Sequence, residues 1–245
     1  MFPIILGFVF VAGVVGGPTE RIVGGSTAPE GRYPYQISLR DLRSGHFCGG
    51  SIIASNWILT AAHCVYGKSA SSMYVVAGAN NLFSGGSKYA VYQVIWHQAY
   101  NPSNNVNDIA LLRLNQNIAF GQKISAISLA NSNPLSGTSC ILSGWGLTSY
   151  PSQQLPSYLQ QISLTAITLR QCVAALPGMP VTQGNLCTYK TYGQGACQGD
   201  SGGPLIANGE QVGVVSWGIP CAKGNPDIFS SVAYFRNWIR AKSGI

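Results

Sequence analysis

The stretch Gly199-Asp200-Ser201-Gly202-Gly203-Pro204 places a serine among glycines, shortly after Cys197. A nucleophilic serine has to be exposed on a tight turn, with backbone N–H groups aimed at the point where an oxyanion will form. Glycines permit such a turn and let a substrate come close to the backbone. A glycine-flanked serine alone is usually only a turn, but here Asp200 and the flanking cysteine also need an explanation. The stretch therefore predicts a nucleophilic Ser201.

Two further stretches carry the side chains that such a serine needs. His63 stands beside small residues and a cysteine in Thr60-Ala61-Ala62-His63-Cys64, and Asp108 opens the apolar run Asn107-Asp108-Ile109-Ala110-Leu111-Leu112. A carboxylate that faces a core needs a partner, and an imidazole N–H is a natural one. Taken alone, His63 would be a packed structural histidine and Asp108 a strand-end cap.

The composition favours short strands joined by tight turns. Charged residues make up 9% of the 245 residues, against the roughly 25% that is usual for soluble domains, and there are 30 glycines. Apolar and polar residues alternate with period two in 35–40 and 162–166, and 211–217 is a further strand candidate. Residues 233–242 form the one strong helix candidate, with Tyr234, Phe235, Trp238 and Ile239 on one face, and 169–175 form a weaker one. The pattern predicts a barrel or sandwich with a C-terminal helix.

The N-terminus is typical of a targeting segment. Residues 2–17 are uncharged and apolar, shorter than the ~20 residues of a spanning helix, and end in small residues with Val14 and Gly16 suited to cleavage after Gly16. The alternative is a buried strand. We expect a signal peptide over 1–16 and a secreted, extracellular mature protein without a membrane anchor.

Cysteines and charge bear on cofactors and partners. The seven cysteines suit an oxidising compartment, and because seven is odd at least one thiol has no partner within the chain. No Cys-x-x-Cys pair occurs and there are only three histidines, so we expect no metal and no cofactor. The net charge of +7 comes without a Lys/Arg cluster, so neither nucleic acid nor a membrane is an expected partner.

Together these motifs resemble the chymotrypsin–trypsin family of serine proteases, in the chain order His, Asp, Ser. The resemblance covers nearly everything from Ile22 onward. It extends to 22–25 (Ile-Val-Gly-Gly), 47–51 (Phe-Cys-Gly-Gly-Ser), 57–59 (Trp-Ile-Leu), 143–146 (Ser-Gly-Trp-Gly), 216–218 (Ser-Trp-Gly) and the closing helix. It implies an all-β fold of two six-stranded antiparallel barrels with a C-terminal helix, in a protease domain 22–245 whose barrels meet near residue 130.

The resemblance also implies the roles of the residues. Ser201 attacks the scissile carbonyl, His63 moves the proton, and Asp108 orients His63. The N–H groups of Gly199 and Ser201 form the oxyanion hole, while Ser216, Trp217 and Gly218 pair with the substrate backbone. The implied partners are protein and peptide substrates and proteinaceous inhibitors, with the enzyme a monomer. The implied disulfides are Cys48–Cys64, Cys172–Cys187 and Cys197–Cys221. Cys140 is left as a buried free thiol or, alternatively, as an intermolecular link.

Activation and specificity follow from the same resemblance. Cleavage after Arg21 would release a propeptide, 17–21, and free the α-amino group of Ile22 to pair with Asp200. At the pocket base Gly195 replaces the aspartate of trypsins, while Asp227 stands where a glycine is usual. This pair resembles the collagenolytic serine proteases of crustaceans and some insect chymotrypsin-like enzymes. We expect cleavage after large apolar residues with added tolerance for basic ones, or a plain chymotrypsin-like preference if Asp227 faces solvent.

Two other functions compete with a digestive or broad-range secreted endopeptidase. One is a catalytically dead homologue that acts as a binding module, but such relatives typically lose Ser, His or Asp, and all three are present. The other is a processing protease of a clotting or immune cascade. Those usually carry extra N-terminal modules, whereas the expected propeptide here has five residues.

Overall fold

The computed structural model describes residues 23–149, 154–219 and 221–245. The predicted signal peptide and propeptide, together with Arg21 and Ile22, lie outside the described residues.

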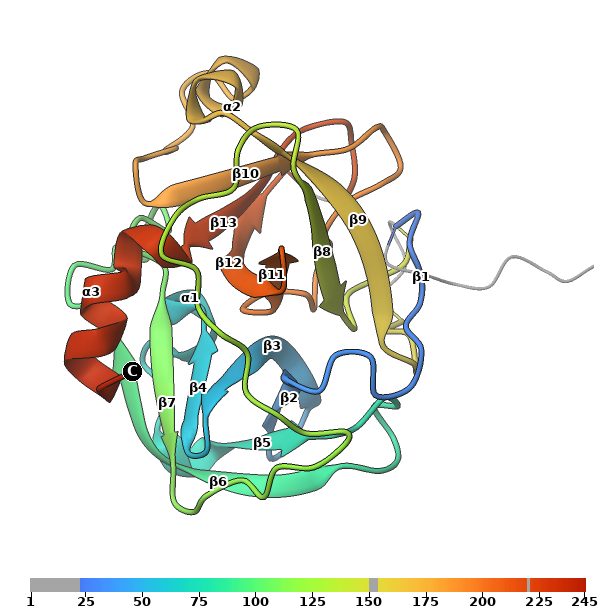
Figure 1. Cartoon of the computed structure of the whole chain (residues 1–245), viewed down its shortest axis with the longest axis vertical. Helices are drawn as coiled ribbons and strands as arrows, with labels where there is room; N and C mark the ends of the chain where they lie inside the picture. The colour runs from blue at the N-terminus through green and yellow to red at the C-terminus, as the bar shows by residue number, and fades with distance from the viewer. Residues whose placement is uncertain (1–22, 150–153, 220) are drawn as a thin grey trace, which may run out of the picture.

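The first half of the chain closes into a six-stranded antiparallel barrel (Figure 1). Its interior is an apolar core of fully buried branched side chains such as Ile37, Ile58 and Leu111. The strands follow one another around the barrel in the order β2-β3-β4-β7-β6-β5. They are β2 (Gln36–Asp41), β3 (Gly45–Ala54), β4 (Trp57–Thr60), β5 (Met73–Ala77), β6 (Ser87–Trp96) and β7 (Ala110–Leu114).

The second half forms another six-stranded barrel, closed by the pairing of β8 with β9. The short strand β1 (Ser26–Thr27) joins it by pairing with β9. The predicted boundary near residue 130 falls in the connection between β7 and β8. The strands are β8 (Ser139–Gly144), β9 (Gln160–Ile167), β10 (Asn185–Tyr189), β11 (Pro204–Ala207), β12 (Glu210–Gly218) and β13 (Asp227–Ser231). The prediction of two antiparallel six-stranded barrels is confirmed.

One strand departs from the expected pattern of burial. Apolar and polar residues alternate in 35–40, yet the polar Gln36 and Ser38 are buried as well. β2 is a strand of the first barrel, and its polar side chains have partners: Gln36 accepts a hydrogen bond from Ser143 of the second barrel, and Ser38 bonds to His46 and Arg40 of its own hairpin. In contrast, β9 keeps the predicted alternation, with Ile162 and Leu164 buried and Ser163 exposed between them.

The C-terminal helix α3 (Val232–Ser243) ties the two barrels together. It follows β13 of the second barrel, yet Phe235 and Ile239 are part of the first barrel's core. Tyr234, which we placed on the apolar face, is exposed. The shorter helical segments are α1 (Ala62–Val65), the 3-10 turn η1 (Ala70–Ser72) and α2 (Leu169–Ala175). Among the described residues, no helix is long and apolar enough to span a membrane.

Three disulfides brace the fold. They join Cys48 to Cys64, Cys172 to Cys187 and Cys197 to Cys221, the same pairs that the resemblance implied. Cys140 is unpaired and fully buried. Burial raises the pKa of its thiol to about 11, so it stays protonated at neutral pH.

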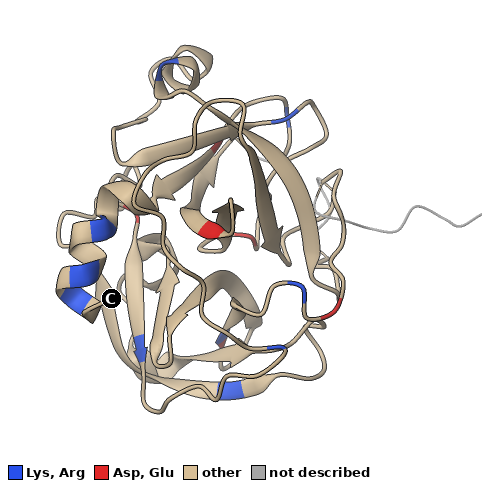
Figure 2. Cartoon of the chain, viewed as in Figure 1, with Lys and Arg blue, Asp and Glu red and all other residues tan. Residues whose placement is uncertain are grey.

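Lys and Arg are spread over many elements, with a few gathered along α3 (Figure 2). Those on the helix are Arg236, Arg240 and Lys242.

Candidate active site

His63 and Asp108 meet in a compact hydrogen-bonded unit. His63 sits on the one-turn helix α1, and Asp108 directly precedes β7. The imidazole Nδ1 lies 2.7 Å from Asp108 Oδ2, and the His63 backbone N–H donates to Oδ1 at 2.8 Å. Because a carboxylate only accepts, Nδ1 carries the proton and Nε2 presents a lone pair.

Two serines of the second barrel donate hydrogen bonds to Asp108, one to its carboxylate and one to its backbone carbonyl. The Ser216 hydroxyl donates to Asp108 Oδ2 at 2.5 Å, and the Ser230 hydroxyl donates to the Asp108 backbone carbonyl at 2.5 Å. The Asp108 side chain is wholly inaccessible, so these donors supply what water would otherwise give. Sequence reasoning assigned Ser216 only to the substrate-binding strand and missed Ser230, since neither contact has a local sequence signal.

Ser201 lies on the turn before β11 and lines a pocket of about 220 Å³. Within the described residues, its hydroxyl makes no hydrogen bond to His63. The imidazole Nε2 is 3.7 Å from Sγ of Cys64. Catalytic hydrogen bonds are often long without substrate and tighten in the complex. The site is therefore assembled from residues of both barrels, and the hydrogen bond between Ser201 and His63 is not formed in this structure.

The turn that carries Ser201 needs glycine at two positions. Gly199 has φ +98° and Gly202 has φ +75°, which side chains rarely tolerate. A Cβ on Gly202 would come within 2.3 Å of Thr60 Oγ1 and 2.8 Å of the Gly49 carbonyl oxygen. In the described part of the chain, the N–H groups of Gly199 and Ser201 have no hydrogen-bond partner, so both are free to bind an oxyanion.

Asp200 points away from the cleft into a fully buried site. Its carboxylate accepts hydrogen bonds from Gly146 N at 2.8 Å and Cys197 N at 3.0 Å. A Cβ on Gly146 would fall 2.2 Å from Oδ2, so a glycine there makes room for the carboxylate. Burial raises the pKa of Asp200 to about 7, and none of the ion pairs among the described residues involves it.

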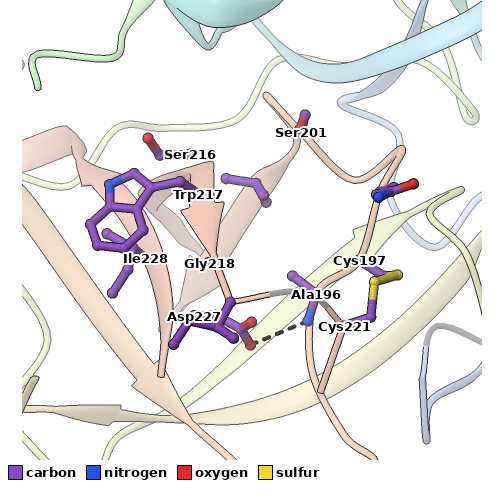
Figure 3. A pocket seen from close by; sticks show the side chains of 12 residues that line it. Ala196, Cys197, Ser201, Ser216, Trp217, Gly218, Cys221, Asp227 and Ile228 are labelled. Atoms are coloured by element: carbon purple, nitrogen blue, oxygen red, sulfur yellow. Dashed lines mark hydrogen bonds between the residues drawn. A yellow bond between two sulfur atoms is a disulfide. The ribbon is translucent and has the colours of Figure 1, made fainter. Parts of the chain in front are cut away.

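Asp227 faces the pocket and not solvent (Figure 3). It lies at the start of β13, opposite Gly218 of β12, and is only 9% exposed. Its Oδ2 accepts a hydrogen bond from Ala196 N at 3.2 Å, and Trp217, Gly218 and Ile228 line the same pocket. The Cys197–Cys221 disulfide joins two walls of the pocket.

Because Gly195 has no side chain, there is room beside it for the Asp227 carboxylate. Any Cβ at that position would lie 2.9 Å from Asp227 Oδ2. Burial raises the pKa of Asp227 to about 7, and the nearby Asp200 charge adds to the rise. The pocket thus holds one acidic group that is uncharged in mildly acidic solution and charged in alkaline solution.

The site does not form a metal centre. Sγ of Cys48, Sγ of Cys64 and a His63 nitrogen lie within 4.8 Å of one another. Both sulfurs are joined in a disulfide, however, and a metal would require thiolates.

This geometry defines the trypsin-like serine proteases. The chain belongs to this family: residues 22–239 match the family model described as Trypsin. It is 44% identical to trypsin delta of Drosophila melanogaster, over 89% of this chain and 87% of that protein. It is 43% identical to chymotrypsin-2 of Vespa crabro, over 89% and 98% respectively.

A solved structure agrees with these relatives. Neuropsin, a serine protease expressed in the limbic system of mouse brain, superposes with a TM-score of 0.83 at 33% identity. The match covers 89% of this chain and 98% of that one. The protein is accordingly a serine endopeptidase, a hydrolase of peptide bonds.

Proposed function

We propose that the protein is a secreted digestive endopeptidase in which Ser201, His63 and Asp108 carry out catalysis. The observation that supports this most directly is the His63–Asp108–Ser216 unit beside a pocket lined by Ser201. We further infer that the enzyme acts as a monomer, hydrolyses proteins and peptides, and is open to proteinaceous inhibitors.

The reaction follows from the donor and acceptor roles of these groups. As Ser201 Oγ bonds to the scissile carbonyl carbon, its proton passes to His63 Nε2, the nitrogen with the free lone pair. The carbonyl oxygen becomes an oxyanion, which the N–H groups of Gly199 and Ser201 bind. His63 then gives the proton to the leaving amine, and water hydrolyses the acyl-enzyme by the same steps. Asp108 stabilises the imidazolium while it exists.

Replacing the nucleophile tests this assignment. We expect Ser201→Ala to abolish labelling by a serine-directed phosphonate and to lower peptide hydrolysis by several orders of magnitude. Ser149→Ala, a change of the same chemistry outside the pocket, serves as the control. A correctly folded Ser201→Ala protein with near-normal turnover would contradict the proposal.

We propose a pocket that takes large apolar P1 residues and also accepts basic ones, P1 being the residue before the cut bond. The apolar walls favour Phe, Tyr or Leu, since burying such a side chain contributes ~1.5–3 kcal/mol. A charge-assisted hydrogen bond from a substrate Arg or Lys to Asp227 is worth roughly 1.5–3 kcal/mol. Because the two magnitudes are comparable, neither class should be excluded.

We also propose that the enzyme is made as a precursor activated by cleavage after Arg21. Asp200 supports this: it is a buried acid with backbone donors but no cation among the described residues, and the new α-amino group of Ile22 would supply one. We expect purified precursor to be almost inactive until trypsin cuts after Arg21, and Arg21→Gln to block that step. Activity in uncut precursor, verified by N-terminal sequencing, would refute it.

A further inference from the structure

The turn that carries Ser201 is held by its carbonyl groups. Four successive carbonyls each accept one hydrogen bond, which leaves the N–H groups of Gly199 and Ser201 free. The donors are Leu147 N to Gln198 O at 2.8 Å, His46 Nε2 to Gly199 O at 3.1 Å, Gly203 N to Asp200 O at 2.9 Å and Gly49 N to Ser201 O at 2.7 Å. Three of these donors are backbone groups that always carry a hydrogen. The fourth, His46, donates only in one tautomer or when protonated.

His46 is the end of a chain of side-chain hydrogen bonds that begins at an arginine. Its Nδ1 lies 2.8 Å from the hydroxyl oxygen of Ser38, and Arg40 Nε donates to the same oxygen at 3.0 Å. Ser38 is completely buried, and the edge of His46 packs against Trp145 with ring centroids 5.6 Å apart. The three polar side chains all belong to the β2–β3 hairpin of the first barrel.

The two ends of this chain set its direction. The Gly199 carbonyl oxygen can only accept, so a neutral His46 carries its proton on Nε2, and its Nδ1 accepts the hydroxyl hydrogen of Ser38. A guanidinium can only donate, so Arg40 occupies one lone pair of Ser38 Oγ and favours the hydroxyl orientation toward His46. The other neutral tautomer would set the Nε2 lone pair against the carbonyl oxygen, two acceptors face to face.

A protonated His46 could also donate to Gly199 O, but its surroundings oppose the charge. Desolvation lowers the pKa of His46 to about 4; the hydrogen bond to Gly199 acts against this, and the Arg40 charge adds to the lowering. The carboxylate of Asp200, next to Gly199 in the chain, is turned to Gly146 N and Cys197 N. Among the described residues, Arg40 forms no ion pair with a carboxylate, and its Nη2 is buried without a hydrogen-bond partner.

We propose that Arg40 is a positioning residue for the hydrolytic reaction, which acts through Ser38 and His46 to hold the Gly199 carbonyl and thereby the oxyanion-binding turn. The proposal rests on the oxyanion role proposed above for Gly199 and Ser201. Arg40 needs no contact with substrate: its effect is to select the histidine tautomer that can donate.

The test compares Arg40→Leu with Arg40→Lys, which keeps a cationic donor, and with Arg43→Leu. Arg43 is exposed in the turn of the same hairpin and controls for the loss of one charge. We expect Arg40→Leu to lower kcat about 10-fold, less than the ~10²–10³-fold cost of losing an oxyanion donor outright. KM should stay nearly constant, because the oxyanion exists only in the transition state. Arg40→Lys should recover part of the loss, and Arg43→Leu should match the wild type.

A spectroscopic measurement reads the tautomer directly. In full-length protein carrying Ser201→Ala to prevent autolysis, ¹⁵N-labelled imidazoles should show His46 protonated at Nε2 alone. Adding Arg40→Leu should give mixed tautomers and a higher His46 pKa, because the Arg40 charge lowers it. Ser38→Ala should also give mixed tautomers, with Arg40 still in place.

Two results would overturn the proposal: an unchanged kcat in folded Arg40→Leu enzyme, or a His46 tautomer that does not respond to Arg40→Leu or Ser38→Ala. If Arg40→Leu fails to fold, Ser38→Ala decides through the same two readouts. Should the wild type itself prove inactive and unlabelled by phosphonate, the proposed function fails, while the tautomer measurement still judges the hydrogen-bond chain.

Discussion

At the residue scale, the proposed role of Asp227 predicts a specificity that depends on pH. Its carboxyl has a pKa raised to about 7, so it is neutral below that pH and charged above it. On the proposed specificity, the charged form should attract a basic P1 side chain, and the neutral form should tolerate an apolar one. Both substrate classes use the same catalytic groups, so the titration of those groups cancels in a ratio of rates.

We therefore expect kcat/KM for an Arg substrate, divided by that for a matched Phe substrate, to rise as pH increases through about 7. Asp227→Asn keeps the shape and removes the charge. It should make the ratio independent of pH and lower cleavage after Arg by roughly 10- to 150-fold, which corresponds to ~1.5–3 kcal/mol. A pH-dependent ratio that survives in Asp227→Asn would show that another group is responsible.

Site residues could be predicted from the sequence only where a short local motif marks them. His63, Asp108 and Ser201 stand in short stretches whose composition is hard to explain otherwise. Ser38, Arg40 and His46 have no such signal, because they meet through the pairing of two strands and reach Gly199 across a separation of 153 residues. The orientation of Asp227 was left open for the same reason, since only the β12–β13 register decides it.

At the scale of elements, the start of α2 depends on one threonine. Thr168 Oγ1 accepts from Gln171 N at 3.1 Å, and Gln171 Oε1 accepts from Thr168 N at 2.9 Å, which together form a capping box. The helix has only seven residues and buries little besides Cys172, so its end contributes a large part of its stability.

We expect Thr168→Ala to cost about 1 kcal/mol. The loss should lower the melting temperature by about 2–4 °C, as is usual for a chain of this size. Thr168→Ser keeps the hydroxyl and should behave like the wild type. Hydrolysis should be unaffected, because Thr168 does not line the pocket. An unchanged melting temperature in Thr168→Ala would show that the disulfide at Cys172 alone holds the helix.

Periodicity predicted those elements whose two faces see different surroundings. β9 has one covered and one exposed face, and its alternation was visible in the sequence. The polar residues of β2 are buried too: Gln36 bonds to Ser143 of the other barrel, and Ser38 bonds to His46 and Arg40 within its own hairpin. No local pattern reveals these partners. The length of α3 was predicted to within a residue at each end, while the exposure of Tyr234 was not.

At the scale of the whole molecule, buried polar pairs join the two barrels. Ser143 of β8 donates to Gln36 Oε1 of β2 at 2.7 Å, and Ser51 of β3 donates to Gln211 Oε1 of β12 at 2.6 Å. Each pair takes its serine from one barrel and its glutamine from the other. Because α3 also inserts Phe235 into the opposite core, the barrels should unfold together.

We expect Ser51→Ala to destabilise the protein by about 1–3 kcal/mol, since it leaves the buried Gln211 oxygen without its donor. The double variant Ser51→Ala/Gln211→Leu should recover part of that loss by removing the orphaned group. Denaturant titration of the Ser201→Ala form, followed by fluorescence and circular dichroism, measures both. Separate transitions by the two probes would contradict the expected cooperativity.

The reactivity of the unpaired Cys140 depends on whether the second barrel is closed or open. While the second barrel is closed, the thiol is inaccessible and its raised pKa keeps it protonated, so alkylating reagents cannot modify it. Once the barrel opens, the thiol regains an ordinary acidity and becomes a nucleophile toward reagents and toward the three disulfides of its own chain. We therefore expect brief unfolding in alkaline solution to let this thiol exchange disulfide partners, which would shorten the lifetime of the enzyme at high pH.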